Sequence, residues 1–121
     1  MPHFKVDDML HSHPKPRRAG LEAMGLWALA GSHCMAYKSD GFVPTWFVAS
    51  WPRGPKLAAQ LVTAGLWFLD AQDNQPGWRF HDWDDVQLTA AEIEADREHS
   101  RERQRKYRAT LRANRNGSHV P

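Results

Sequence analysis

Apolar positions dominate residues 21–37, and they fall on every side of a helix drawn through the segment. This stretch, LEAMGLWALAGSHCMAY, holds one acid and no Lys or Arg. A helix that is apolar all round is normally buried on most of its faces. The pattern therefore predicts the central helix of a small domain. The preceding arm, residues 1–18, contains three prolines and is expected to be irregular, with apolar side chains available for docking at Phe4, Val6, Met9 and Leu10.

Turn residues divide the next part of the chain into short elements. The sequence KSDG at 38–41 predicts a turn, and residues 42–43 predict a short extended piece. Pro44 disfavours helix before it and suits the first turn of a second helix, which we expect at 45–51. Helical spacing predicts that the core-facing residues of this second helix are Phe47, Val48 and Trp51.

A third helix is predicted at residues 55–64, after a turn with the sequence PRGP at 52–55. Gly65 supplies the residue that commonly ends a helix. The apolar face of this helix carries Leu57, Leu61 and Ala64. The opposite, polar face carries Lys56, Gln60 and Thr63. The third helix is therefore amphipathic, with a surface able to donate hydrogen bonds.

Two aromatic-rich segments, residues 66–70 and 78–83, flank a polar loop at 71–77 that contains Pro76 and Gly77. This composition predicts a β-hairpin. Alternation along the second strand turns Trp78 and Phe80 to one side and Arg79 and His81 to the other.

Charge is divided sharply near the C-terminus. Residues 82–96 hold six acids and no Lys or Arg, whereas residues 97–115 hold eight bases and two acids. Thr89 and Glu92 form a capping box, which predicts a basic helix at 89–115 after an acidic linker at 84–88, with a disordered tail at 116–121. After Ile93 this helix has only two large apolar residues, Tyr107 and Leu111. It therefore either projects into solvent or stays partly disordered until it binds a partner.

The predicted order of elements is helix, short strand, helix, turn, helix and hairpin. This is the order of a winged helix, a helix-turn-helix with a β-hairpin wing. We therefore expect an α+β, mainly α fold, with a winged-helix domain at 19–83 and a projecting basic helix.

The chain also resembles a family of small bacteriophage proteins. GLWALAGSHCMAYKSDGFVP, followed by LAAQLVTAGLW and GWRFHDW, is similar to winged-helix or replication-initiation-like proteins of phages that infect actinobacteria, over roughly residues 4–106. A more distant resemblance is to DnaD-like phage replisome organisers. The resemblance implies a role in phage DNA replication, and it brings no catalytic motif with it.

In a helix-turn-helix the helix after the turn lies in the DNA major groove. The residues that this predicts at base edges are Lys56, Gln60 and Thr63, with Arg53 in the turn placed for a phosphate. The alternative is an ordinary solvated helix face. In the wing, Arg79 is the candidate for DNA contact, and an equally good alternative pairs it with Asp70 across the hairpin.

The basic helix carries the stronger electrostatic signal. Arginines recur there at steps of three and four residues and form one stripe about 21 Å long, made of Arg101, Arg105, Arg108, Arg112 and Arg115. Such a stripe can contact several phosphates. The alternative is a solvated helix with Glu98–Arg101 and Glu102–Lys106 pairs, but two glutamates cannot neutralise eight bases.

Other functions find little support. No apolar run approaches the roughly 18 residues of a membrane helix, and charges at the N-terminus argue against secretion. One cysteine, Cys34, fits a reducing cytoplasm, here that of the bacterial host, and scattered histidines do not form a zinc pattern. There is no phosphate loop and no nucleophile beside a base, so we expect neither enzyme activity, a small-molecule substrate nor a cofactor. The tryptophans assigned to core packing rather than base stacking are Trp27, Trp46, Trp51, Trp67 and Trp78, with Trp83 at the domain edge.

The sequence thus predicts a cytoplasmic protein that binds double-stranded DNA as an accessory or initiator factor in phage replication. One alternative is a phage transcriptional regulator. Another, from a different class, is a protein-interaction module whose winged-helix surface binds a host or phage replication protein.

Overall fold

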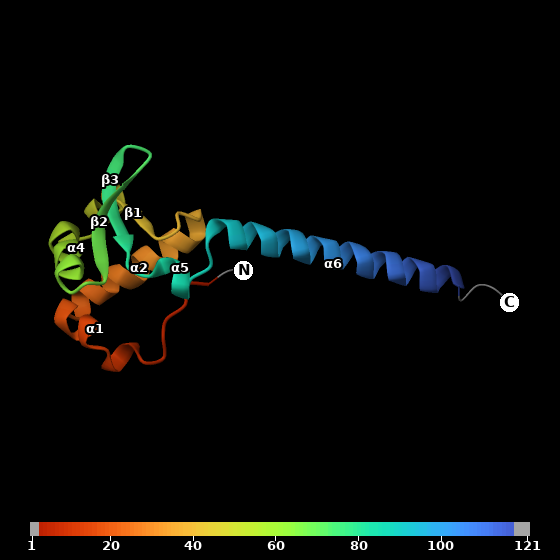
Figure 1. Cartoon of the computed structure of the whole chain (residues 1–121), viewed down its shortest axis with the longest axis horizontal. Coiled ribbons are helices and arrows are strands. Elements are labelled where there is room, and N and C mark those ends of the chain that lie inside the picture. The colour runs from red at the N-terminus through yellow and green to blue at the C-terminus, as the bar shows by residue number, and fades with distance from the viewer. Residues whose placement is uncertain (1–2, 118–121) are drawn as a thin grey trace. The chain divides into compact units, whose positions relative to one another are not determined.

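The structure is a computed structural model that describes residues 3–117, with side chains described as far as residue 114 (Figure 1). The chain divides into two compact units, residues 1–90 and residues 91–121, and each is described by itself. The expected α+β, mainly helical class is confirmed. Residues 118–121 of the predicted tail and the Arg115 side chain lie outside the described part.

The helices of the described chain are α1 (Pro14–Ala19), α2 (Leu21–Tyr37), α3 (Thr45–Ala49), α4 (Gly54–Thr63), α5 (Trp83–Val86) and α6 (Ala90–Gly117), with a single 3-10 turn at Leu10–Ser12. The strands are β1 (Phe42–Pro44), β2 (Trp67–Gln72) and β3 (Gln75–Phe80). The predicted central helix, 21–37, has the observed bounds of α2.

The strands form one antiparallel sheet with the order β1-β3-β2. Gln72 pairs with Gln75, so the hairpin turn consists of Asp73 and Asn74 alone, at φ 52° and 64°. Positive φ at both positions is the type I′ geometry that suits a twisted hairpin. The predicted loop at 71–77 was therefore too long. β1 pairs with β3 only as far as Gly77, and Pro76 lies beyond that point. The missing N–H of Pro76 therefore costs no hydrogen bond to β1.

The core of the first unit lies between the sheet and helices α2, α3 and α4. Fully buried side chains there include Val43, Val48, Leu61 and Trp67. The predicted core face of the third helix is confirmed, because Leu57, Leu61 and Ala64 are all buried. Phe47 and Val48 of α3 are buried as expected, but Trp51 is 38% exposed, and its prediction as a core residue was wrong. Residue 51 lies beyond the end of α3, where the chain already turns.

The N-terminal arm is more ordered than the sequence suggested. Pro14 and Pro16 occupy the first turn of α1, where a backbone N–H has no helical partner in any case, so they begin a helix instead of preventing one. His13 Nδ1 accepts the Lys15 N–H at 3.2 Å and caps this helix. Phe4 docks the arm, with its ring centroid 4.9 Å from that of Trp27 and 5.9 Å from that of Trp83.

Residues 81–89 also differ from expectation. β3 ends at Phe80 and not at Trp83, because Asp82 adopts a left-handed conformation and α5 begins at the next residue. Trp83 is buried, and the Gln87 side chain exchanges two hydrogen bonds, of 2.8 and 2.6 Å, with the Lys5 backbone. The segment predicted as an acidic linker therefore packs as part of the first unit.

The second unit consists of most of α6. Helix α6 runs for 28 residues, about 42 Å, and continues to Gly117, two residues beyond the predicted end of the basic helix. Every side chain from 101 to 114 is exposed.

Candidate nucleic-acid interface

The junction between α3 and α4 fixes where α4 begins. Arg53 precedes α4 in a left-handed conformation, at φ 58°. Gly54 follows and lies so close to α3 that a Cβ on it would collide with the Val48 carbonyl oxygen. A side chain at residue 54 would force the two helices apart, so this glycine sets the α3–α4 geometry.

The outer face of α4 carries the side chains that the sequence proposed for base contact. Lys56 and Thr63 are exposed, whereas Gln60 is partly buried. No ion pair engages Lys56 within the described part of the chain, and its ammonium group is available to an anion. The structure thus brings these three residues to one surface of the first unit.

Arg53 is already engaged inside the protein. Its guanidinium forms an ion pair with the Glu22 carboxylate at the start of α2, and both side chains are substantially exposed. Exposed pairs of this kind contribute only about 0–1 kcal/mol. The pair therefore orients Arg53 without preventing exchange of its partner for a phosphate.

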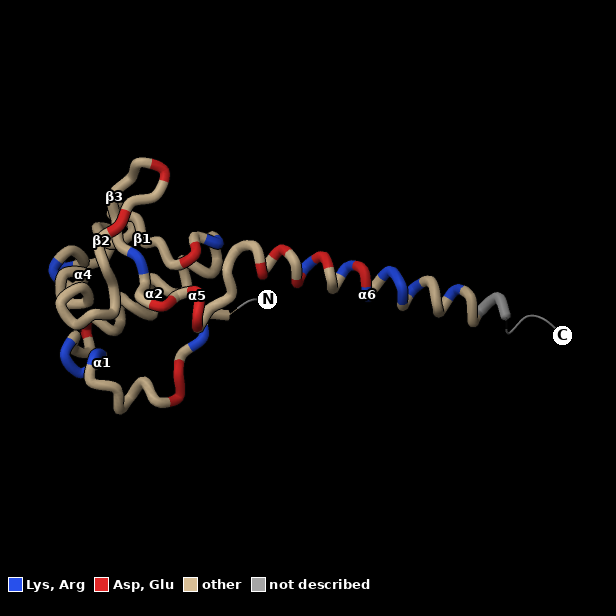
Figure 2. Tube along the Cα trace, viewed as in Figure 1, with Lys and Arg blue, Asp and Glu red and all other residues tan. Residues whose placement is uncertain are grey.

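A group of cations on α1 was missed by the sequence analysis, which treated residues 1–18 as irregular. Lys15 lies near the C-terminal end of α4, with its Cε 3.6 Å from the place of a Cβ on Gly65. Arg17 and Arg18 follow on the last turn of α1 and are exposed. In Figure 2 the blue segments of α1 and α4 lie at the same margin of the unit. The run PKPRR, a proline-initiated basic helix, was the available signal.

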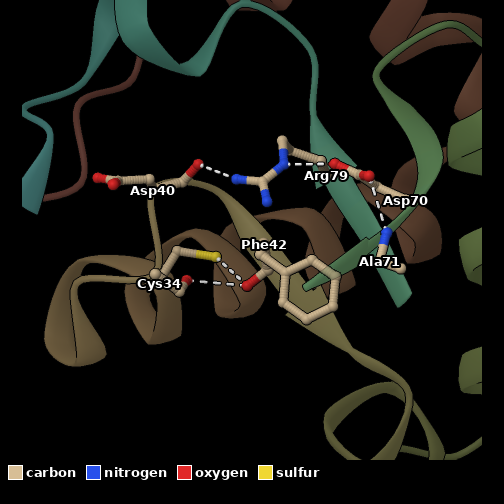
Figure 3. Close-up of polar contacts among 7 residues, drawn as sticks. Cys34, Asp40, Phe42, Asp70, Ala71 and Arg79 are labelled. Carbon is tan, nitrogen blue, oxygen red and sulfur yellow. Dashed lines mark hydrogen bonds and ion pairs between the residues drawn. The ribbon is translucent and has the colours of Figure 1, made fainter. Parts of the chain in front are cut away.

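Arg79 lies in a network that links β2, β3 and the turn before β1 (Figure 3). Its Nε donates to Asp70 Oδ2 at 2.6 Å, and its Nη1 donates to the Asp40 carbonyl oxygen at 2.8 Å. The guanidinium carbon lies 5.5 Å from the centre of the Phe42 ring. The Asp70 pairing that the sequence left open is therefore present, and the network leaves Arg79 poorly placed to contact a phosphate.

Two pKa values reflect this part of the fold. The Arg79 hydrogen bond, with a second one from the Ala71 N–H, lowers the pKa of Asp70 below its ordinary value. Burial raises the pKa of the Cys34 thiol to about 11, although Ser39 and Arg79 oppose the shift. Cys34 donates to the Phe42 carbonyl oxygen at 3.3 Å and behaves as a core residue.

The hairpin and α5 present acids, not bases. Asp73 lies in the hairpin turn, and Asp84 and Asp85 lie on α5, all of them exposed. Acidic side chains repel phosphate, so these surfaces are unsuited to a nucleic acid. Cations of the first unit therefore concentrate on α1, on α4 and in the turn before α4.

Helix α6 carries the arginine stripe. The described arginines of the stripe are all exposed, namely Arg101, Arg105, Arg108 and Arg112. Among side chains up to residue 114 neither the Glu98–Arg101 nor the Glu102–Lys106 pair is present, whereas Arg97 forms an ion pair with Glu94 at 3.6 Å. The stripe thus retains its positive charge.

Two tryptophans assigned to the core from the sequence are exposed instead. Trp46 is 61% exposed and Trp51 38%, both on the outer side of α3 and the turn after it. Trp67 and Trp83 are buried, and Trp83, expected at the domain edge, is part of the core. Alternation and helical spacing indicate a preferred face, but they do not show how much of a short helix its neighbours cover.

The chain shows no significant match to any protein-family model, curated protein or solved structure. The resemblance to phage proteins accordingly stays a prediction. Within the described residues no helix combines the length and apolar character needed to cross a membrane. No group of three or more His, Cys, Asp or Glu side chains in the same residues is arranged to hold a metal ion.

Proposed function

We propose that this protein binds double-stranded DNA through the polar face of α4, the α1 cations and the arginine stripe of α6. The observation that carries the proposal is the stripe, because its described arginines are exposed and lack a carboxylate partner within the described chain. Few ligands other than a polyanion match such a row of charges. A nucleic acid is such a polyanion, with its phosphate charges spaced along a line.

The dimensions of the stripe suit a phosphate backbone. From Arg101 to Arg112 the helix rises about 16 Å, while phosphates follow one another about every 3.4 Å of axis along each strand. Four side chains can therefore each reach a different phosphate. Contacts of this kind give affinity without sequence preference.

Sequence preference is assigned to α4. The element order from α2 to β3 and the strand order β1-β3-β2 support a winged-helix arrangement, in which the helix after the turn enters the major groove. Lys56 and Gln60 are the side chains suited to guanine and adenine edges there, and Thr63 lies farther along the same face. Arg53 and the α1 cations contact the flanking phosphates. The acidic hairpin takes no part in binding.

Fluorescence anisotropy with a labelled duplex at several salt concentrations tests the proposal. The double variant Arg101→Gln/Arg108→Gln removes two charges from the stripe. The slope of log affinity against log salt should therefore become shallower by about two. The matched control, Arg103→Gln/Lys106→Gln, removes two charges from other sides of α6 and should change the slope by less than half as much. Absence of duplex binding by the wild-type protein in dilute buffer would overturn the proposal.

We further propose that the setting is phage DNA replication in the cytoplasm of a bacterial host, on the strength of the family resemblance. A transcriptional regulator would use the same surfaces. Footprinting on the phage genome separates the two, since protection of an origin supports replication and protection of a promoter supports regulation.

A further inference from the structure

A cavity lies beneath the N-terminal arm of the first unit. Its volume is about 240 Å³, and it is partly open to solvent. Residues from 4 to 16 line one side, and residues of α2, β3 and α5 line the other, together with residues 65–66. Apart from Lys15, the lining residues take no part in the proposed contact with DNA. The cavity therefore needs an explanation of its own.

Aromatic rings make up much of the cavity wall. They come from four different segments, namely Phe4 of the arm, Trp27 of α2, Phe80 of β3 and Trp83 of α5. The ring centroids of Phe4 and Trp27 are 4.9 Å apart, and those of Phe80 and Trp83 are 5.1 Å apart. Such rings favour edge-on or offset contacts with another aromatic group. Since a cavity of about 150 Å³ can hold benzene, this one has room for a single ring with a short substituent.

Trp83 brings an unsatisfied hydrogen-bond donor to this wall. The residue is 4% exposed, and its Nε1 has no partner within the part of the chain that the structure describes. Buried donors are normally paired, so an indole N–H without an acceptor requires an explanation. Of the unpaired buried polar atoms in the same residues, Nε1 of Trp83 is the one whose side chain lines the cavity. A ligand in the cavity can supply the missing acceptor.

The arm adds two further donors. Lys15 lines the cavity and is half-buried, and no ion pair engages its ammonium group among the side chains described, residues 3–114. The His13 ring, which also lines the cavity, accepts the Lys15 backbone N–H at Nδ1, so a neutral ring has its proton at Nε2. Hydrogen bonds from an ammonium group to an anionic acceptor are among the strongest in proteins. The cavity is therefore better suited to an anion than to a neutral ligand.

The acids along the cavity already have partners. Asp7 Oδ1 accepts the Met9 N–H at 2.9 Å, and Asp82 Oδ2 lies 3.3 Å from His81 Nδ1. All four residues are exposed, so these carboxylates are also in contact with water. The acids are thus less available to a ligand than the donors on the arm and on Trp83.

We propose that this cavity binds a small aromatic carboxylate, whose ring lies among the four aromatic side chains and whose carboxylate pairs with the Lys15 ammonium group. The Trp83 indole N–H lies beside the bound ring and donates to an acceptor on the ligand. Such a ligand contacts the arm and the body of the first unit together, so its binding should hold the arm in place and stabilise the fold. This site goes beyond the proposed function, because DNA has no part in it.

Nuclear magnetic resonance titration of the full chain with phenylacetate tests the site. The indole N–H resonance of Trp83 should shift and reach saturation. Phenylacetamide has the same shape without the charge and should bind about tenfold more weakly. Acetate, which lacks the ring, and phenethylamine, which carries the opposite charge, should leave the resonance unchanged.

Lys15→Met tests the anchor for the carboxylate, because it removes the ammonium group but keeps an apolar stem near Gly65. It should weaken phenylacetate binding by about tenfold or more, the loss expected for a hydrogen bond to a charged group. The matched control, Lys106→Met on α6, makes the same change outside the cavity and should leave the affinity unchanged. Phenylacetate should also raise the melting temperature of the wild type, and less so that of Lys15→Met. Circular dichroism verifies that both variants are folded.

A Trp83 resonance that does not respond to phenylacetate would overturn the proposal. Equal affinities for phenylacetate and phenylacetamide, or unaltered binding by folded Lys15→Met protein, would also contradict it, because the carboxylate would then not be recognised. Preference for phenethylamine would instead assign the cavity to a cation held by Asp7 and Asp82. None of these results depends on duplex binding, so this inference and the proposed function fail separately.

Discussion

Arg79 joins three segments that are distant in the sequence, because its guanidinium contacts Asp70, the Asp40 carbonyl oxygen and the Phe42 ring. Asp40 in turn accepts the Ala90 N–H at 2.6 Å through its carboxylate. At the scale of single residues, Arg79 was the hairpin residue that the sequence offered for DNA contact, and in the structure it instead links segments of the first unit.

Replacing Asp70 by Asn should lower the melting temperature at neutral pH, because Arg79 then loses a charged acceptor. The effect depends on pH with a definite sign. Since Arg79 lowers the pKa of folded Asp70 below the ordinary 3.8, the stabilisation is complete above the unfolded pKa and disappears as pH falls through the folded one. The melting temperatures of the wild type and of Asp70→Asn should therefore converge at acid pH. Asp73→Asn, in the hairpin turn, is the control and should change little; a pH-independent difference for Asp70→Asn would contradict the assignment.

Cys34 should be inert in the folded protein. With its pKa raised to about 11, only about one thiol in a thousand is ionised at pH 8, and the side chain is buried. Reaction with a disulfide reagent should be slow in buffer and fast in guanidinium chloride. The exposed Leu29→Cys variant provides the comparison, and rapid labelling of wild-type Cys34 under native conditions would show that the core opens there.

At the scale of elements, α3 and α4 approach as closely as Gly54 allows. Gly54→Ala should destabilise the fold by about 1–3 kcal/mol, the usual cost of overpacking, because the new Cβ meets the Val48 carbonyl oxygen. Denaturant unfolding measures the change. Gly25→Ala, at an open position of α2 where a Cβ meets nothing within 4 Å, is the matched control and should be neutral or stabilising.

The elements also show which features a sequence pattern can predict. The bounds of α2 followed from its composition, and the amphipathic face of α4 followed from its spacing, because both are local properties. Helix α1 and the Asp73–Asn74 turn were missed although their signals, an initial proline and two residues tolerant of positive φ, were present. The exposure of Leu21 and Leu29 on α2 could not be predicted from the sequence, since an apolar residue has the same periodicity whether or not a neighbour covers it.

The candidate site was predictable to a similar extent. Lys56, Thr63 and the described stripe arginines are exposed, as their positions in the pattern suggested. Whether a cation is free depends instead on partners from remote segments, as Arg53 with Glu22 and Arg79 with Asp40 illustrate. Helical periodicity contains no information on such partners.

At the scale of the whole molecule, the small net charge of +2 conceals a division between the units. Residues 1–90 hold eight Lys and Arg against nine Asp and Glu, whereas residues 91–121 hold eight against five. The affinity for a polyanion should therefore reside mostly in the second unit, and the sequence preference in the first.

A chain ending at Asp96 tests this division, because it lacks all eight bases of the second unit. We expect duplex affinity at low salt to fall steeply. The slope of log affinity against log salt should become shallower by about four or more, while the preference among sequences persists. Competition titrations measure both quantities. If the shortened chain kept the full salt dependence, the stripe would not be the principal contact.

The docking of Phe4 has a consequence for the core. This ring comes from an irregular arm, yet it fills the space over Gly31 and contacts Trp27, Phe80 and Trp83. Because Phe4 belongs to no helix or strand, release of the arm would expose these three aromatic rings to water without unfolding a helix or a strand. Tryptophan emission would then shift to the red while the far-ultraviolet circular dichroism spectrum stayed constant. Fluorescence would therefore detect release of the arm without any loss of secondary structure.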